Sequence, residues 1–168
     1  LYSGASVPFK YKGANQTDLV TNGDMSNAGS WTAENTWDVN NSVANKAYGE
    51  GDSGNNILWQ TVSADLAGKM VRLRFTVSNS SLVGTNQLTV SYIVGSDYQV
   101  GLDDDGNNLW DDGVHVLTGI MNSTTQKVYF RLRTTATSGS IEIDDVSLTQ
   151  IGAVAEYDGS GAGASRWD

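Results

Sequence analysis

The densest set of side chains that can do chemistry is an acidic run in the second half of the chain. Five aspartates occupy residues 103–105 and 111–112, with Gly106 between them. Hard cations such as calcium bind six to eight oxygen atoms of this kind. Gly106, however, is the fourth residue of the run and not the sixth, as an EF-hand loop requires. The run therefore fits a solvated hairpin loop that charge holds open, with a calcium site as the alternative.

Arginines form a second pattern, in two predicted strands. Arg72 and Arg74 alternate with apolar residues in one strand, and Tyr129, Arg131 and Arg133 do so in the other. Guanidinium groups form bidentate hydrogen bonds with carboxylates and also bind hydroxyl groups. If the two strands are neighbours, the arginines form a cationic platform for uronic or other acidic sugars, with Tyr129 as a stacking surface. The alternative is that they pair with carboxylates across the strands.

Trp110 is the third candidate, since an aromatic ring stacks on the apolar face of a pyranose. It lies within the acidic run, where no strand periodicity surrounds it. An exposed loop tryptophan is a typical ligand contact, and the alternative is that the ring folds back onto the domain. Trp59 lies in a predicted strand, and its neighbours do not decide which side of the sheet it faces. The candidate carbohydrate contacts are Trp110, Tyr129, Arg131, Arg133, Arg72 and Arg74.

Residues for catalysis are few. The chain has one histidine, His115, and no cysteine, so a Cys-ligated zinc site, a thiolate nucleophile and a histidine-based triad lack their parts. Glycoside hydrolysis needs only two carboxylates, but no pair among the 19 acidic residues stands in the apolar surroundings of a typical general acid. The glycines of residues 159–163 lack the strand and helix that frame a phosphate-binding loop. We therefore expect a non-enzyme, with a glycan-degrading domain as the remote alternative.

Short strands must position these side chains. From residue 70 to 77 apolar and polar residues alternate strictly, and residues 128–133 repeat the pattern. Val114 and Val116 continue an apolar face, which places His115 on the opposite side. The apolar parity of the last strand changes near Asp144 and Asp145, which predicts a β-bulge there. About eight to ten strands, without sustained helical periodicity, predict an all-β fold: a two-sheet antiparallel β-sandwich of the jelly-roll type.

Composition bounds the domain organisation and the partners. At 168 residues the chain has the size of one domain. Its net charge of −9 disfavours nucleic acid and anionic membranes as partners, and no apolar run approaches the ~20 residues of a membrane helix. We expect no nucleic-acid binding and no membrane insertion. Pattern and composition divide the chain into an N-terminal connector (1–17), the β-sandwich domain (18–150) and a C-terminal linker toward a following module (151–168).

Three segments carry a family likeness: LVTNGDMSNAGSW at residues 19–31, LWQTV with GKMVRLRFTVSN within residues 58–79, and GSIEIDDVSL at residues 139–148. Together they resemble the galactose-binding-like jelly-roll carbohydrate-binding modules, the group that contains families four, nine and twenty-two. The resemblance covers about residues 18–150. It implies a non-catalytic domain that binds a polysaccharide or a cell-surface glycan, with Trp31 and Trp37 in the core.

The resemblance also implies a structural calcium ion between an early turn and the last strand. Asn22, Gly23 and Asp24 match the turn. Ser26 stands where the family has a ligating glutamate, so one carboxylate is lost unless Asp24 or Glu50 replaces it. The candidate metal residues are Gly23, Asp24, Glu50, Asp144 and Asp145.

The flanking segments VPFKYKGANQTDLVTNG and IGAVAEYDGSG are similar to junctions in bacteriophage tail-fibre and other virion proteins. This likeness implies a domain on a virion surface or otherwise outside the cell, between neighbouring modules of a longer chain that assembles as a trimer. Repeated copies would raise the avidity of adhesion. The alternative function is a structural spacer or protein-interaction domain of a virion protein. An aromatic, polar surface indicates sugar binding, whereas an exposed apolar patch indicates a protein contact.

Overall fold

The computed structural model of the chain describes residues 9–12, 17–34, 37–48, 56–62, 66–84, 88–90, 99–100, 102–121, 127–132, 136–151 and 154–157. Almost all regular structure in these ranges is β, accompanied by a short 3-10 turn, η1 (Ala28–Ser30). In the same ranges no helix is long and apolar enough to cross a membrane.

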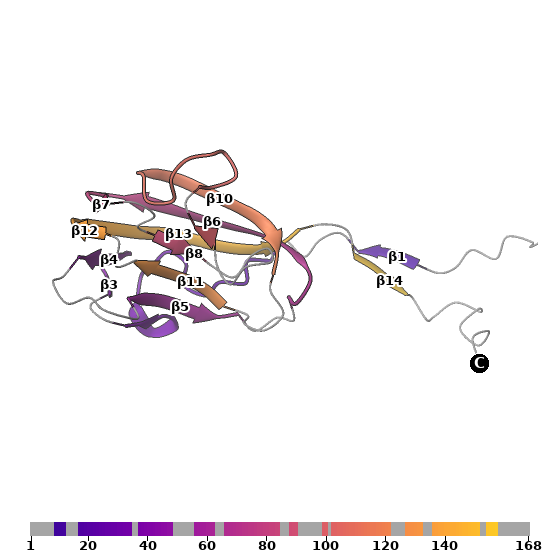
Figure 1. Ribbon diagram of the computed structural model, residues 1–168. Coiled ribbons are helices and arrows are strands. Elements are labelled where there is room, and N and C mark those ends of the chain that lie inside the picture. Colours follow the sequence, from indigo (N-terminus) through magenta and orange to yellow (C-terminus); the bar gives the residue numbers. More distant parts are fainter. Residues whose placement is uncertain are drawn as a thin grey trace, which may run out of the picture.

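The longest alternating segment lies at the centre of the first sheet. Strand β6 (Met70–Ser78) pairs with β10 (Gly113–Ile120) on one side and with β13 (Ser140–Gln150) on the other. Strands β4 (Val43–Ala47) and β3 (Asp38–Asn40) complete the antiparallel order β10–β6–β13–β4–β3 (Figure 1). Every second side chain of β6 is buried, as its alternation predicts.

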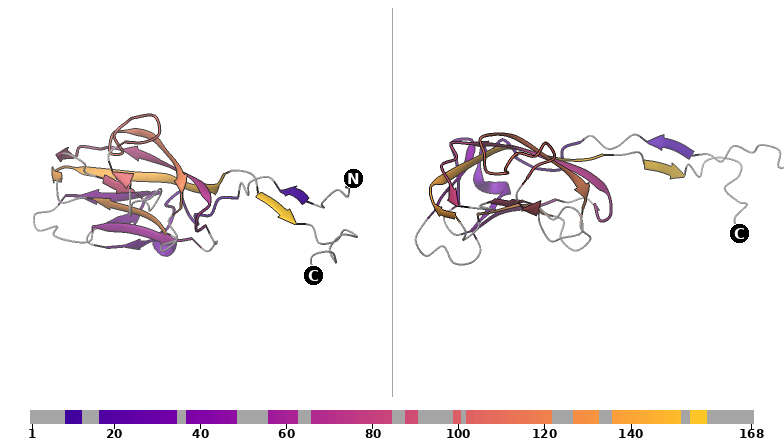
Figure 2. Two further views of the ribbon diagram at one scale, coloured as in Figure 1. Left: turned by 45° about the vertical axis from the view of Figure 1, so that its right-hand side comes forward. Right: turned by 45° about the horizontal axis from the view of Figure 1, so that its top comes forward.

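The second sheet packs against the apolar side of the first. Its order is β2 (Thr32–Ala33), β5 (Ile57–Thr61), β11 (Lys127–Leu132), β8 (Leu88–Val90) and β9 (Gln99–Val100), with antiparallel neighbours throughout. The two sheets form the layers seen in Figures 1 and 2. The predicted all-β, two-sheet jelly-roll sandwich is confirmed.

Aromatic side chains join the two sheets in the core. Phe75 of β6 and Phe130 of β11 meet edge to face, with ring centroids 5.1 Å apart, a favourable geometry for two rings. Trp31 lies 6.4 Å from Phe130 between ring centroids, and Trp37 donates its indole N–H to the carbonyl of Asn56 at 2.9 Å. Both tryptophans are buried. Their predicted place in the core is confirmed.

Strand β13 contains the predicted bulge. Its register against β6 shifts between Asp144 and Ser147, and Asp145 has a left-handed φ of 49°. Apolar side chains on both sides of the shift are buried in the core, although their sequence parity differs. Because of the bulge, the apolar side chains before and after the shift all face the core, so the whole strand has one apolar side.

The predicted orientation of β10 is wrong. Val114 is 47% exposed, whereas His115 is 2% exposed and faces the core beside Leu117. The valines therefore lie on the outer side of the sheet. Local alternation favoured the opposite assignment because a histidine is usually the outward residue of such a pair. Polar partners from the acidic run stabilise the His115 ring in this inward orientation.

The two flanks of the domain pair with each other. Strand β1 (Phe9–Lys12) and strand β14 (Val154–Tyr157) form an antiparallel ribbon, which lies beyond one end of the sandwich in Figures 1 and 2. The chain enters and leaves the sandwich side by side, because Asp18 Oδ1 accepts hydrogen bonds from the backbone N–H groups of Val20 and Leu148, each 3.0 Å long. A second short ribbon joins β7 (Val83–Gly84) to β12 (Ala136–Ser138).

Candidate functional site

The arginine-bearing strands belong to different sheets. Strand β6 pairs with β10 and β13, whereas β11 pairs with β5 and β8. The condition for the cationic platform, that these strands are neighbours, is therefore not met, and the platform prediction is wrong. Alternation within each strand could show that the arginines face outward, but it could not show which strands pair.

Arg72 and Arg74 lie on the outer face of the first sheet. Both side chains are exposed, and neither forms an ion pair with a residue in the described ranges. Their register partners on β10 are Thr118 and Val116. The predicted pairing with carboxylates across the strands is thus not seen among these residues. Arg133 lies outside the described residues.

Two aromatic side chains lie next to each other on the outer face of the second sheet. Trp59 of β5 and Tyr129 of β11 are register partners. Trp59 is half-buried, and Tyr129 is 7% exposed. In each strand the residues immediately before and after the aromatic residue face the core. Successive side chains of a strand point to opposite sides, so the two rings lie on the side turned away from the core. We call the outward residues of the two strands the β5–β11 face: Ile57, Trp59, Thr61, Lys127, Tyr129 and Arg131.

Cations stand at both ends of this face. The Lys127 Nζ atom lies 3.4 Å from the centroid of the Trp59 ring, a cation–π contact. Arg131 is paired in register with Ile57 of β5 and with Thr89 of β8. The sequence analysis missed Lys127 and left open which side of the sheet Trp59 faces. Lys127 has the same parity as Tyr129 and Arg131, and this signal could have found it.

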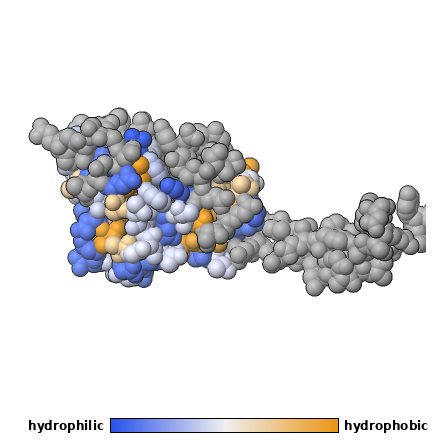
Figure 3. Space-filling model, turned by 90° about the horizontal axis from the view of Figure 1, so that it is seen from below, coloured by the Kyte–Doolittle hydropathy of each residue, from blue (hydrophilic) through white to orange (hydrophobic). Residues whose placement is uncertain are grey.

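The described surface beside β5 carries no large apolar patch. Figure 3 views the molecule from below, the side on which β5 lies in Figure 1. Hydrophilic and neutral residues cover most of the coloured surface there, and the apolar spots are small and separate. A surface of this kind is typical of polar ligands and atypical of a protein interface core.

Trp110 takes the second of its two predicted alternatives. Its side chain is half-buried and packs against the hydrophobic core, next to the fully buried Leu109. The ring therefore contributes to the packing of the acidic loop, residues 102–112.

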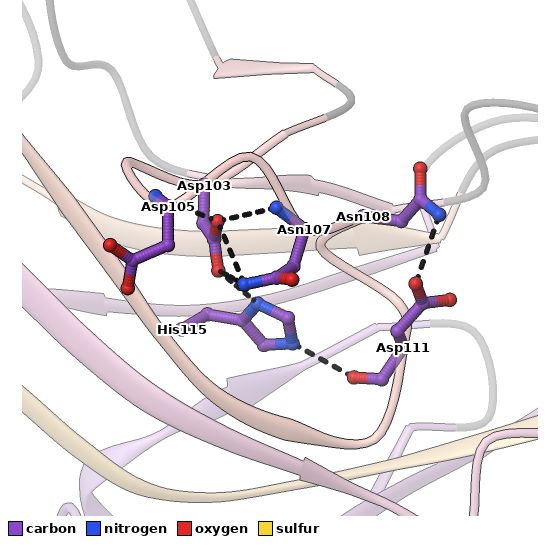
Figure 4. A network of polar contacts seen from close by, with 6 residues as sticks. All are labelled: Asp103, Asp105, Asn107, Asn108, Asp111 and His115. Atoms are coloured by element: carbon purple, nitrogen blue, oxygen red, sulfur yellow. Dashed lines mark hydrogen bonds and ion pairs between the residues drawn. The ribbon is translucent and has the colours of Figure 1, made fainter.

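Asp103 organises the acidic loop from within (Figure 4). Its Oδ1 atom accepts hydrogen bonds from the backbone N–H groups of Asp105 and Asn107, at 3.0 and 2.8 Å. The side-chain amide of Asn107 donates to its Oδ2 atom at 3.3 Å. Asp103 is thus buried and used internally, which favours the solvated hairpin loop over a calcium site in the run.

His115 holds the same loop from the sheet. Its Nδ1 atom lies 2.8 Å from Asp103 Oδ2, and its Nε2 atom lies 2.8 Å from the carbonyl oxygen of Asp111 (Figure 4). A neutral imidazole has one N–H, so only the protonated ring donates to both acceptors. The histidine–aspartate pair resembles two parts of a catalytic triad, but in the described residues the partner of Nε2 is the Asp111 carbonyl and not a nucleophile.

Electrostatics differ between the two aspartate clusters. Burial opposes ionisation of Asp103, but hydrogen bonds from the Asn107 backbone and from His115 outweigh it and hold its pKa below the usual value. At the bulge, burial and the nearby carboxylates of Asp145 and Asp24 raise the pKa of Asp144, against a hydrogen bond from the Asp145 backbone. The early turn and the last strand therefore bring like charges together.

The turn of the predicted metal site packs directly on β13. The carbonyl of Gly23 accepts a hydrogen bond from the Val146 N–H at 2.9 Å. Asp24 accepts from the Ser26 N–H, and Asp145 accepts from the Thr76 hydroxyl at 3.4 Å. In the described ranges no group of three or more acidic or histidine side chains is arranged to hold a metal ion. Glu50 lies outside these ranges, so the described residues alone do not make a full calcium site, and calcium stays a prediction.

Comparisons with known proteins give only distant similarities to solved structures. No protein-family model and no curated protein matches the sequence. A tailspike protein 4 domain of bacteriophage CBA120 has a TM-score of 0.43 and 16% identity over 82% of this chain, which spans 22% of that chain. A CBM4 structure has a TM-score of 0.45 and 15% identity, covering 80% of this chain and 92% of that chain. The N-terminal cellulose-binding domain of Cellulomonas fimi β-1,4-glucanase C has a TM-score of 0.48 and 14% identity, covering 82% of this chain and 100% of that chain.

Proposed function

We propose that the domain is a non-catalytic carbohydrate-binding module that binds a polysaccharide or cell-surface glycan through the β5–β11 face. The observation that carries the proposal is the half-buried Trp59 ring on the outward side of β5, with the buried Tyr129 ring beside it in register. Aromatic rings stack on the apolar faces of sugar rings, and the hydroxyl of Thr61 and the cations at both ends offer hydrogen bonds to sugar hydroxyls.

We place this module on a phage tail fibre or another virion-surface protein, because its flanks resemble junctions in such proteins. A single shallow face binds weakly, and several copies on one trimeric fibre raise the avidity. The β1–β14 ribbon leaves the sandwich at one end, so attachment through it does not cover the β5–β11 face (Figure 2).

The test is a glycan array that includes neutral and acidic polysaccharides. Wild type is compared with Trp59→Ala and with a matched control on the other sheet, the double variant Arg72→Ala and Arg74→Ala. We expect binding that Trp59→Ala abolishes and the control retains. Loss of binding only in the control would move the site to the outer face of the first sheet, and absence of all binding would overturn the proposal.

A protein-contact spacer is the second candidate, and one observation favours it. On the outer face of the first sheet, Met70 and Ile120 are register partners that are 43% and 47% exposed. Adjacent exposed aliphatic side chains are typical of a protein contact. If the domain is a spacer, the double variant Met70→Thr and Ile120→Thr should weaken assembly of the fibre. Wild type should then bind no glycan.

Calcium binding at the early turn is a subordinate part of the proposal. Its support is the proximity of the Gly23 backbone and Asp24 to Asp144 and Asp145 on the bulge. A calcium ion would neutralise like charges that now oppose each other and would fasten the turn to the last strand. Thermal unfolding with calcium and with chelator tests this directly.

A further inference from the structure

Lys127 covers the ring on which a sugar would stack. Its Nζ atom lies 3.4 Å above the Trp59 centroid, and Trp59 points away from the core. A pyranose needs the same position, in contact with the same face of the ring. Sugar stacking on Trp59 therefore requires the lysine side chain to move. Lys127 and Trp59 are both half-buried, but they meet through one cation–π contact and the lysine stem is flexible, so a suitable ligand can displace it.

The chemistry of the surrounding strands indicates what that ligand carries. Lys127, Tyr129 and Arg131 share one side of β11, so the cations bracket the aromatic pair about 13 Å apart along the strand. The described residues of β2, β5, β8 and β11 include no aspartate or glutamate, and Glu34, which follows β2 and donates its backbone N–H to the Ile57 carbonyl, is the single acidic residue beside the Ile57 end of the face in the described ranges. The chain as a whole has 19 acidic and 10 basic residues. A locally cationic face on an acidic protein favours an anionic ligand at that face and repels it elsewhere.

We infer that the glycan is acidic, with a carboxylate on its sugar rings, and that Lys127 is the residue that selects it. The carboxylate attracts the ammonium group away from Trp59 and forms a charge-assisted hydrogen bond with it. The uncovered ring then stacks on the sugar. A neutral glycan offers Lys127 no such partner, so it must displace the lysine without compensation. This inference rests on the proposed function, because it assigns a ligand class to the same face.

The experiment compares uronic-acid polysaccharides with their own carboxyl-reduced forms. Polygalacturonate, alginate and hyaluronan are used as probes in affinity electrophoresis and calorimetry, with wild type, Lys127→Gln, Lys127→Arg and Trp59→Ala. We expect wild type to bind at least one acidic form about tenfold more tightly than its reduced form. Lys127→Gln should lose this preference by weaker acidic and stronger neutral binding, Lys127→Arg should retain it, and Trp59→Ala should bind neither form.

The other outcomes distinguish a failure of the inferred acidic ligand from a failure of the proposed function. Equal binding of acidic and reduced forms, abolished by Trp59→Ala, would overturn the acidic ligand and leave the proposed function intact. An acidic preference that persists in Lys127→Gln would overturn the role of Lys127. No binding of any probe by wild type, together with an array that shows none, would overturn both.

A measurement without ligand tests the covering lysine. Acrylamide quenching of tryptophan fluorescence should increase in Lys127→Gln relative to wild type, because the Trp59 ring loses its cover. The increase should vanish in the background of Trp59→Phe, which removes the reporting indole. Unchanged quenching in Lys127→Gln would contradict the covering of Trp59 by Lys127.

Discussion

His115 and Asp103 form a buried hydrogen-bonded pair between the sheet and the loop that runs above it. Nδ1 and Oδ2 are 2.8 Å apart, and the two side chains are 2% and 1% exposed. The second ring nitrogen binds the Asp111 carbonyl at the other end of the loop. One side chain of β10 thus fixes both arms of the acidic loop, and the backbone N–H of Asp104 bonds the Val116 carbonyl on the same strand.

The first prediction concerns this pair. His115→Ala should lower the free energy of unfolding by about 3 kcal/mol, because it leaves the buried Asp103 carboxylate and the Asp111 carbonyl without their hydrogen-bond partner. Asp104→Asn, which alters an exposed carboxylate of the same loop, should change it by less than about 0.5 kcal/mol. Urea denaturation of the variants measures both values. Equal, small effects would show that the pair contributes little to stability.

The second prediction concerns acid. The pKa of Asp103 is lower in the folded chain than in the unfolded chain, so its contribution to stability is present above about pH 3.9. This contribution is lost as the pH falls through the folded pKa. Asp103→Asn should therefore be less stable than wild type at pH 6, and the difference should shrink below pH 4. A difference that stays constant from pH 6 to pH 3 would contradict the assignment.

The third prediction concerns the stability of the chain with and without calcium at the bulge of β13. The raised pKa of Asp144 means that its contribution is present below about pH 3.9 and lost as the pH rises through the folded pKa. In chelator at pH 7, Asp144→Asn should raise the unfolding temperature by removing repulsion with Asp24 and Asp145. If calcium binds here, the same variant should lose the stabilisation that calcium gives to wild type. A wild-type unfolding temperature that calcium does not move would contradict the metal site.

The fourth prediction concerns the contact between the early turn and β13. A Cβ atom on Gly23 would lie 1.9 Å from the Val146 carbonyl oxygen, so Gly23→Ala forces the two backbones apart. We expect a loss of about 2–3 kcal/mol, by the overpacking mechanism. Gly68→Ala is the control, since its left-handed φ of 72° carries a conformational cost of about 1 kcal/mol but its Cβ would meet nothing within 4 Å. Equal losses in thermal or urea unfolding would contradict the close contact.

The sequence predicted what local alternation encodes. The bulge followed from a change of apolar parity within one strand, near Asp144 and Asp145, and needed no knowledge of neighbouring strands. The core positions of Trp31 and Trp37 followed from the family likeness. The bulge depends on residues close together in the chain, whereas the core contacts of Trp31 and Trp37 are with distant residues.

The candidate site depended on contacts between distant residues, and it was predicted poorly. Pairing decides whether Arg74 and Arg131 share a surface, and alternation carries no information on pairing. The sequence left open which side of the sheet Trp59 faces, and its register with Tyr129 places it on the β5–β11 face. His115 was assigned outward because its buried partner, Asp103, lies 12 residues earlier in a loop. A polar residue with a distant partner breaks the rule that polar residues face solvent.

The measurement that tests the central claim most directly is backbone amide chemical-shift mapping with the tightest glycan from the array. If the domain binds sugar on the β5–β11 face, shifts should concentrate at Ile57–Thr61 and Lys127–Leu132 and the Trp59 indole, with little change along β6 and β10. Shifts that instead follow the outer face of the first sheet, around Arg72 and Met70, would contradict the account.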